Sequence, residues 1–170
     1  MPHRQTAVIF YRTSAVEYLL GHYTAMSLPT AREINPVPED LDGKYAEKHF
    51  LGKTLEDAEA LFRENSLVYQ ENLMFMGASA FRYYVQAAIS YIQSEAADDD
   101  SDIINCFAGL LEHRLEFEAQ ELVAVAPLLA SACRYVLEHY DRFTITPEIY
   151  GDLRPRFQAL EQTFLHQIHK

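Results

Sequence analysis

The stretch from Met74 to Gln93, MFMGASAFRYYVQAAISYIQ, decides the fold class of this chain. Its apolar and aromatic side chains recur every three or four residues, which is the spacing that places side chains on one face of an α-helix. One side carries Phe81, Val85 and Ile92, whereas the opposite side is largely polar. The pattern therefore predicts a buried helix near residues 80–93.

The same periodicity predicts further helices on both sides of this one. Thr54 is a helix-capping residue type followed by acidic side chains that suit a helix N-terminus, so a short helix is expected to begin there. Pro127 requires the next apolar run either to begin near Ala126 or to kink there. Helices are thus expected near residues 14–26, 54–62, 103–116, 127–140 and 147–168, with 67–76 as a packed connector.

Proline at positions 29, 36 and 38 predicts a loop over residues 27–43. The short run from Ala7 to Tyr11 is compatible with either a short strand or an early helical turn. The fold class expected for residues 1–170 is all-α. We expect a compact single-domain bundle of five or six helices, either with or without a short extended segment at the N-terminus.

The charge balance restricts the partners of the protein. There are 25 Asp and Glu against 14 Lys and Arg, which gives a formal net charge of −11. Such a charge repels the phosphate backbone, so no nucleic-acid partner is expected. The same field attracts a basic protein, although an acidic surface also serves solubility alone.

The sequence also indicates where the protein resides. Cys106 and Cys133 lie in apolar helical patterns rather than in a closely spaced pair, as expected for reduced thiols in the cytoplasm. The apolar run near the N-terminus is short and interrupted by Arg12, which argues against a signal peptide. No uninterrupted apolar segment approaches the roughly 20 residues that cross a bilayer, so we expect no membrane association.

No motif in the sequence indicates a catalytic, cofactor or metal site. There is no HExxH, Cys-x-x-Cys or glycine-rich phosphate loop, and the acidic run at 98–102 lacks the glycine and glutamate of a calcium loop. His113 with Glu116, and His166 with His169, are single pairs that do not complete a metal site. We therefore expect no cofactor, no metal and no catalytic residues.

Arg82 and Tyr83 form the most suggestive polar pair, because a guanidinium can bind a carboxylate in fork geometry beside a phenol. Glu112, His113 and Glu116 are further candidates for a binding site between helices. The structural alternative is that Arg82 pairs with an acidic residue across the bundle while Tyr83 and Tyr84 fill the core.

Residues 80–87, AFRYYVQA, resemble the run AFRYYLPAYL of an uncharacterised bacterial domain family. The preceding FLGKT at 50–54 is similar to a segment upstream of that run, and the likeness extends over about residues 50–143. Gln86 stands where the family often has proline. The resemblance implies a small helical domain without an assigned activity, so it carries over no site residues.

Three hypotheses about function remain open. The preferred one is a cytoplasmic protein-binding module, such as an immunity or antitoxin-like inhibitor of a basic partner. The second is a small-molecule sensor or enzyme with an inter-helix pocket near Arg82 and Tyr83. The third is a homo-oligomer that associates through exposed members of its 11 Tyr and 10 Phe.

Overall fold

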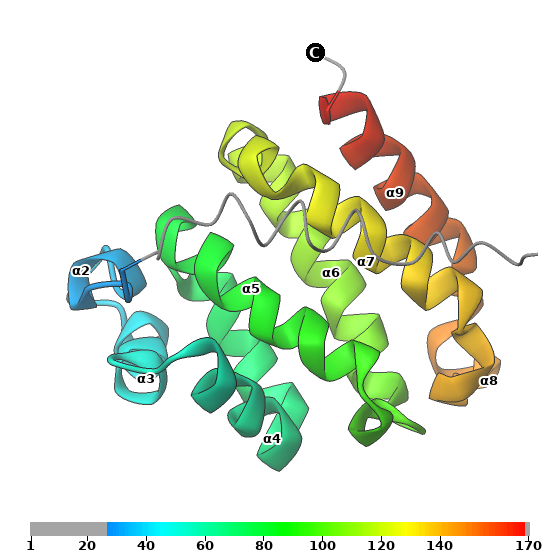
Figure 1. Cartoon of the computed structure of the whole chain (residues 1–170), viewed down its shortest axis with the longest axis horizontal. Coiled ribbons are helices and arrows are strands. Elements are labelled where there is room, and N and C mark those ends of the chain that lie inside the picture. The colour runs from blue at the N-terminus through cyan, green and yellow to red at the C-terminus, as the bar shows by residue number, and fades with distance from the viewer. Residues whose placement is uncertain (1–26, 169–170) are drawn as a thin grey trace, which may run out of the picture.

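The computed structural model describes residues 27–168, and within that range it contains helices and no strand (Figure 1). The expected all-α bundle is confirmed. The helix expected at 14–26 and the run from Ala7 to Tyr11 lie outside the described residues. The six long helices are α3 (Leu41–Phe50), α4 (Leu55–Phe75), α5 (Ala78–Gln93), α6 (Ser101–Glu118), α7 (Ala126–Glu138) and α9 (Arg154–Ile168).

Helix α5 is the central element predicted from the sequence. It packs against α4, which also contacts α3 and α6. Its side chains Phe81, Tyr84 and Val85 are completely buried, and Ser90 and Gln93 are exposed. At the far end of the bundle α9 lies alongside α7, whereas α2 (Ala31–Ile34) and α3 form the opposite end (Figure 1).

The predicted loop over residues 27–43 is wrong in its extent. Thr30 caps α2 through a reciprocal capping box with Glu33, and Asp40 caps α3 by accepting from two backbone amides of its first turn. The irregular stretch between these helices is confined to residues 35–40, where two of the prolines lie. Capping side chains near the prolines begin these helices, which the number of prolines alone does not predict.

The predicted connector over residues 67–76 is also wrong, because α4 continues to Phe75. The helix breaks once, at Asn65, whose φ of −157° and ψ of 92° are not helical. The Asn65 side chain accepts a hydrogen bond from the Val68 amide at 3.2 Å and so caps the second half of α4. Two helical segments thus meet at a kink that the sequence periodicity does not mark.

The proline at 127 begins α7 rather than kinking it. A 3₁₀ segment, η2 (Ala119–Val125), precedes α7, which starts at Ala126 as expected. The prediction of one helix from 147 to 168 is wrong in one respect, because the segment is divided into two helices, α8 (Pro147–Tyr150) and α9. Gly151 separates them with a φ of +70°, a conformation that glycine adopts without a steric penalty.

Arg114 of α6 is a buried cation, with only 2 % of its surface exposed. Its guanidinium donates to the carbonyl oxygens of Leu73 at 2.6 Å and Met76 at 2.5 Å, and it pairs with Glu118. It also lies 4.6 Å from the centroid of the Phe81 ring. Burial lowers the pKa of Arg114, while Glu118 opposes that shift. The contact joins the C-terminal end of α4 to α5 and α6.

One stretch of the described residues, Ser101–Glu138, is long and apolar enough to cross a membrane by length and composition. It comprises α6, η2 and α7 rather than one unbroken α-helix, and 44 % of its most apolar window is buried in the fold. Core helices of soluble proteins meet the same criterion. The expectation of no membrane association therefore stays a prediction.

Replacing Arg114 with alanine is expected to lower the free energy of unfolding by about 3–5 kcal/mol. The substitution leaves the Leu73 and Met76 carbonyls without their buried donor and removes the cation from the end of α4. Urea unfolding followed by circular dichroism measures the change. Arg63→Ala is the control, because its half-exposed ion pair with Glu59 is worth about 0.5 kcal/mol. Similar losses for both variants would contradict the role of Arg114.

Stability is expected to fall as the pH rises from about 9 to 12. Burial raises the pKa of Tyr84, Tyr91 and Cys133 to about 12 each, whereas unfolding restores values of about 10 for tyrosine and about 8.5 for cysteine. Between those values the unfolded chain loses protons that the folded chain keeps, so ionisation favours unfolding. Urea midpoints at successive pH values measure this loss.

Tyr84→Phe supplies the control for that pH dependence. The Tyr84 hydroxyl donates to the Phe50 carbonyl at 2.6 Å and the Lys53 carbonyl at 3.0 Å, so its removal costs about 1–3 kcal/mol at neutral pH. The same variant should show a shallower decline between pH 10 and 12, because one titrating group is gone. An unchanged decline would contradict the assignment to Tyr84.

Candidate functional site

The structure places Arg82 and Tyr83 in structural roles. The Arg82 guanidinium donates to the Glu121 carboxylate at 2.7 Å and to the Glu121 carbonyl at 3.1 Å, which joins α5 to η2. Tyr83 is only 8 % exposed, its ring meets the Tyr84 ring edge-on at 4.9 Å, and burial raises its pKa. The AFRYY residues thus bind neighbouring elements together.

Glu112, His113 and Glu116 lie on the exposed side of α6. The Glu112 carboxylate accepts from Arg156 of α9 at 2.8 Å and 2.6 Å, and this pairing raises the pKa of Arg156. The His113 ring packs against Phe117, with centroids 4.8 Å apart. Glu116 has no hydrogen bond or ion pair with another described residue. Helix α6 brings these three together, but none shares a bond with Arg82 or Tyr83.

The two cysteines are free thiols. Cys133 is fully buried in α7, and Cys106 of α6 is half-buried. Burial is the main cause that raises the pKa of both thiols. A nucleophilic cysteine requires the opposite shift, so neither thiol has the electrostatic environment of a catalytic group.

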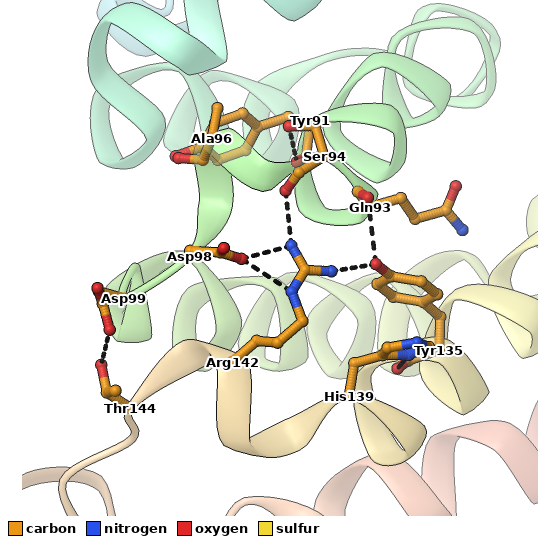
Figure 2. Close-up of polar contacts among 10 residues, drawn as sticks. All are labelled: Tyr91, Gln93, Ser94, Ala96, Asp98, Asp99, Tyr135, His139, Arg142 and Thr144. Atoms are coloured by element: carbon orange, nitrogen blue, oxygen red, sulfur yellow. Dashed lines mark hydrogen bonds and ion pairs between the residues drawn. The ribbon is translucent and has the colours of Figure 1, made fainter.

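Arg142 is the centre of a second polar cluster that the sequence does not reveal (Figure 2). Its guanidinium donates to the Asp98 carboxylate at 2.5 Å and 2.8 Å, to the Ser94 carbonyl at 2.8 Å, and to the Tyr135 hydroxyl. The Tyr135 hydroxyl in turn donates to the Gln93 carbonyl at 3.1 Å. These contacts join α7 and the following 3₁₀ segment, η3 (Tyr140–Phe143), to the end of α5 and the turn that leads to α6.

Two residues in this cluster have left-handed backbone conformations that are uncommon outside glycine. Asp99 has a φ of 65° and Thr144 a φ of 43°. The Thr144 hydroxyl donates to the Asp99 carboxylate at 3.0 Å, and the Asp99 amide donates to the Arg142 carbonyl at 2.9 Å. These donors and acceptors bind one another across neighbouring elements, and we therefore assign the cluster to structure.

A groove between α3 and the second half of α4 is the candidate functional site. It is a hollow of about 250 Å³ open to solvent. Its lining combines two carboxylates, two aromatic rings and a polar floor, and it contains no Lys or Arg. The lining residues are Asp42, Tyr45 and His49 from α3, and Val68, Glu71, Asn72 and Phe75 from α4.

The floor of the groove is held by hydrogen bonds between its own groups. The Nδ1 atom of His49 lies 3.1 Å from the Asn72 Oδ1 atom, and the Asn72 amide group donates to the Val68 carbonyl at 2.5 Å. The His49 ring also meets the Tyr69 ring edge-on at 5.2 Å. The histidine is therefore fixed in position, and it links the two helices that form the walls.

The rim of the groove is apolar and accessible. Tyr45 and Val68 are 58 % and 42 % exposed. Together with Asp42 and Glu71 they present apolar surface beside unneutralised carboxylates. A partner with a long, positively charged side chain matches this combination, because its stem contacts the rim while its charged end meets the carboxylates.

The sequence prediction missed this site for an identifiable reason. The sequence pattern predicts a loop at the first turn of α3 and a connector at the second half of α4. It therefore predicts no helix for either wall of the groove. Only an exposed tyrosine at 45, in a segment with charged neighbours, offered a signal. The pairing of α3 with α4 depends on tertiary contacts that periodicity does not encode.

The described residues contain no group of three or more His, Cys, Asp or Glu side chains arranged to hold a metal ion. A second hollow of about 190 Å³ lies at the α7–α8–α9 end, where Tyr140, Asp152 and Arg154 are among the lining residues. There the Arg154 side chain already pairs with Asp152 at 2.9 Å and covers the Tyr140 ring. Among the described residues that line it, the only cation, Arg154, is thus engaged within the fold, and this hollow differs in that respect from the α3–α4 groove, whose described lining has no Lys or Arg.

Comparison of the chain with models of known protein families, with curated proteins and with solved structures finds no match. The resemblance to the AFRYY family therefore stays a prediction.

Thiol labelling is expected to distinguish the two cysteines. In the native protein Cys133 should resist a chromogenic disulfide reagent because it is fully buried, whereas half-buried Cys106 should react slowly. In denaturing urea both should react rapidly. Absorbance of the released thiolate against time gives the number of reacting groups. Rapid native reaction of two thiols would contradict the burial of Cys133.

Proposed function

We propose that this protein binds a basic protein partner through its acidic surface, as an immunity or antitoxin-like inhibitor would. The observation that supports the proposal is that most of the described basic side chains form ion pairs within the fold, whereas most of the carboxylates do not. Residues 27–168 include all the acidic residues except Glu17 and all the basic ones except Arg4, Arg12 and Lys170. They therefore hold 24 carboxylates and 11 basic side chains.

Eight of those 11 basic side chains form ion pairs within the fold, each with a different carboxylate. Only Arg32, Lys48 and Lys53 remain outside such pairs among the described residues, against 16 carboxylates. The acidic excess is thus concentrated in carboxylates that form no ion pair with another residue in the range 27–168. A surface of this kind accelerates association with a positively charged protein.

The α3–α4 groove supports the same function by offering a place of contact. Its two carboxylates are outside the internal ion pairs, and Tyr45 is an exposed aromatic of the kind enriched at interfaces. An inhibitor needs no catalytic group of its own, because occupying the partner's functional surface suffices. The cytoplasmic location expected from the sequence is part of this proposal.

The geometry supports the two other hypotheses less well. A pocket near Arg82 and Tyr83 would need free polar groups, yet the Arg82 guanidinium is engaged by Glu121 and Tyr83 is buried. Self-association would use exposed apolar side chains such as Leu41 and Tyr45. Light scattering over a range of protein concentrations decides it, because a homo-oligomer gains mass as concentration rises.

The proposal is tested by affinity capture from native lysate at low salt, followed by mass spectrometry. We expect enrichment of a basic protein whose affinity, measured with purified components, falls steeply as salt rises from 50 to 200 mM. The variant Asp42→Asn with Glu71→Gln should weaken binding at least tenfold. Glu116→Gln, an exposed carboxylate outside the groove, is the matched control.

Two results would contradict the proposal. One is the absence of any specific macromolecular partner at low salt. The other is a partner whose affinity is insensitive to salt, since the argument depends on charge. Circular dichroism of each variant confirms that it is folded before affinities are compared.

A further inference from the structure

The groove between α3 and α4 has the chemistry of a socket for one cationic side chain. We infer that it receives an arginine of the protein partner. This inference rests on the proposed function and deepens it by naming the group that is recognised. Four properties of the groove carry it: charge, aromatic surface, size and a fixed floor.

The charge of the lining selects a cation. Asp42 projects from the first turn of α3, and Glu71 comes from α4 on the other wall. Neither carboxylate forms an ion pair with a described residue, and no Lys or Arg lines the groove. The nearest lysines of α3, Lys44 and Lys48, line a separate hollow with Glu47 and Leu51. A cation entering the groove therefore meets two carboxylates that have no ion-pair partner among the described residues, and it shares the Tyr45 ring with the Lys48 ammonium.

The aromatic residues favour a guanidinium over an ammonium. Tyr45 and Phe75 line the groove, and the ammonium of Lys48 already lies 5.9 Å from the centroid of the Tyr45 ring. That distance is at the limit of a cation–π contact, so a cation can approach the face of this ring. A guanidinium is planar, more weakly hydrated than an ammonium, and able to stack on a ring while its five donors bind carboxylates.

The size of the groove suits one such side chain. Its volume of about 250 Å³ corresponds to roughly eight water molecules at about 30 Å³ each. An arginine side chain has seven non-hydrogen atoms. It can therefore fit in the hollow, with its aliphatic stem against Val68 and Phe75.

The amide group at the floor of the groove is not available to bind an anion. The Asn72 side chain is only 6 % exposed, and both of its polar atoms are engaged, one with His49 and one with the Val68 carbonyl. The side-chain carboxylates of Asp42 and Glu71 form no hydrogen bond or ion pair with a described residue. Because the floor is held by its own hydrogen bonds, the walls keep their spacing when no ligand is present.

The test uses the full chain and three tripeptides, acetyl-Gly-X-Gly-amide with X as arginine, lysine or citrulline. Citrulline keeps the shape of arginine and removes its charge. Titrations followed by two-dimensional NMR should shift resonances of Tyr45, His49 and Val68, with the arginine peptide at least threefold tighter than lysine and tenfold tighter than citrulline. Glu71→Gln should weaken arginine binding at least threefold, and Glu116→Gln should leave it unchanged.

Three results would overturn the inference: equal affinity for the arginine and citrulline peptides, tighter binding of lysine, or shifts confined to residues outside the groove. Both glutamates are exposed, and the NMR spectrum of each variant reports directly whether it is folded. A Tyr45→Leu variant provides an independent measurement, because it keeps the carboxylates and removes the ring. Unchanged preference for arginine over lysine in that variant would contradict the stacking argument.

Failure of the inference is distinguishable from failure of the proposed function. A salt-sensitive basic partner that binds the protein while citrulline and arginine peptides bind the groove equally would overturn the socket and support the function. An arginine-selective groove in a protein that captures no basic partner would support the socket and count against the function. An increase in mass with protein concentration, lost in Glu71→Gln, would identify a second copy as the occupant and overturn the choice of a different partner.

Discussion

The contact on which the rest of the structure depends is the burial of Arg114 against the C-terminal end of α4. A buried guanidinium is costly to desolvate, and this one is stabilised by two carbonyl oxygens, one carboxylate and the face of Phe81. The carbonyls at a helix C-terminus carry partial negative charge, so the cation satisfies groups that the helix itself leaves unbonded. A single side chain thereby fixes α4, α5 and α6 relative to one another.

The geometry of the groove depends on that contact. Glu71, Asn72 and Phe75 belong to the last turns of α4, and the Leu73 carbonyl bound by Arg114 lies between them in the sequence. The opposite wall is held by the Tyr84 hydroxyl, which binds the Phe50 carbonyl at the end of α3. Both walls of the proposed binding site are therefore positioned by polar side chains that emerge from the core helices α5 and α6.

The sequence predicted the parts of the fold in which hydrophobic periodicity is strong. The burial of α5 follows from its pattern, and the start of α7 at Ala126 follows from the backbone chemistry of Pro127. The errors occurred where local signals compete. Prolines at 36 and 38 hid the helix starts at Thr30 and Asp40, and no periodic feature distinguishes Leu67–Met76 as helix rather than packed connector.

The candidate site was harder to predict than the fold, because it is formed by a pairing of helices rather than by a motif. Arg82 and Tyr83 drew attention as a polar pair, yet the structure gives them partners of their own in Glu121 and Tyr84. Asp42 and Glu71 are separated by most of α3, a turn and most of α4, and nothing in their spacing indicates that they share a groove. Charge composition favours a basic partner, which stays a proposal, and it gives no indication of where such a partner would bind.

The break in α4 at Asn65 has a consequence for cooperativity. A helix whose hydrogen-bond ladder is interrupted and capped again contains two segments that can open separately. The segment before the break is anchored by Phe62 in the core, and the segment after it carries one wall of the groove. Amide hydrogens on the two sides of Asn65 can therefore exchange with solvent at different rates, and occupation of the groove would slow exchange on the C-terminal side alone.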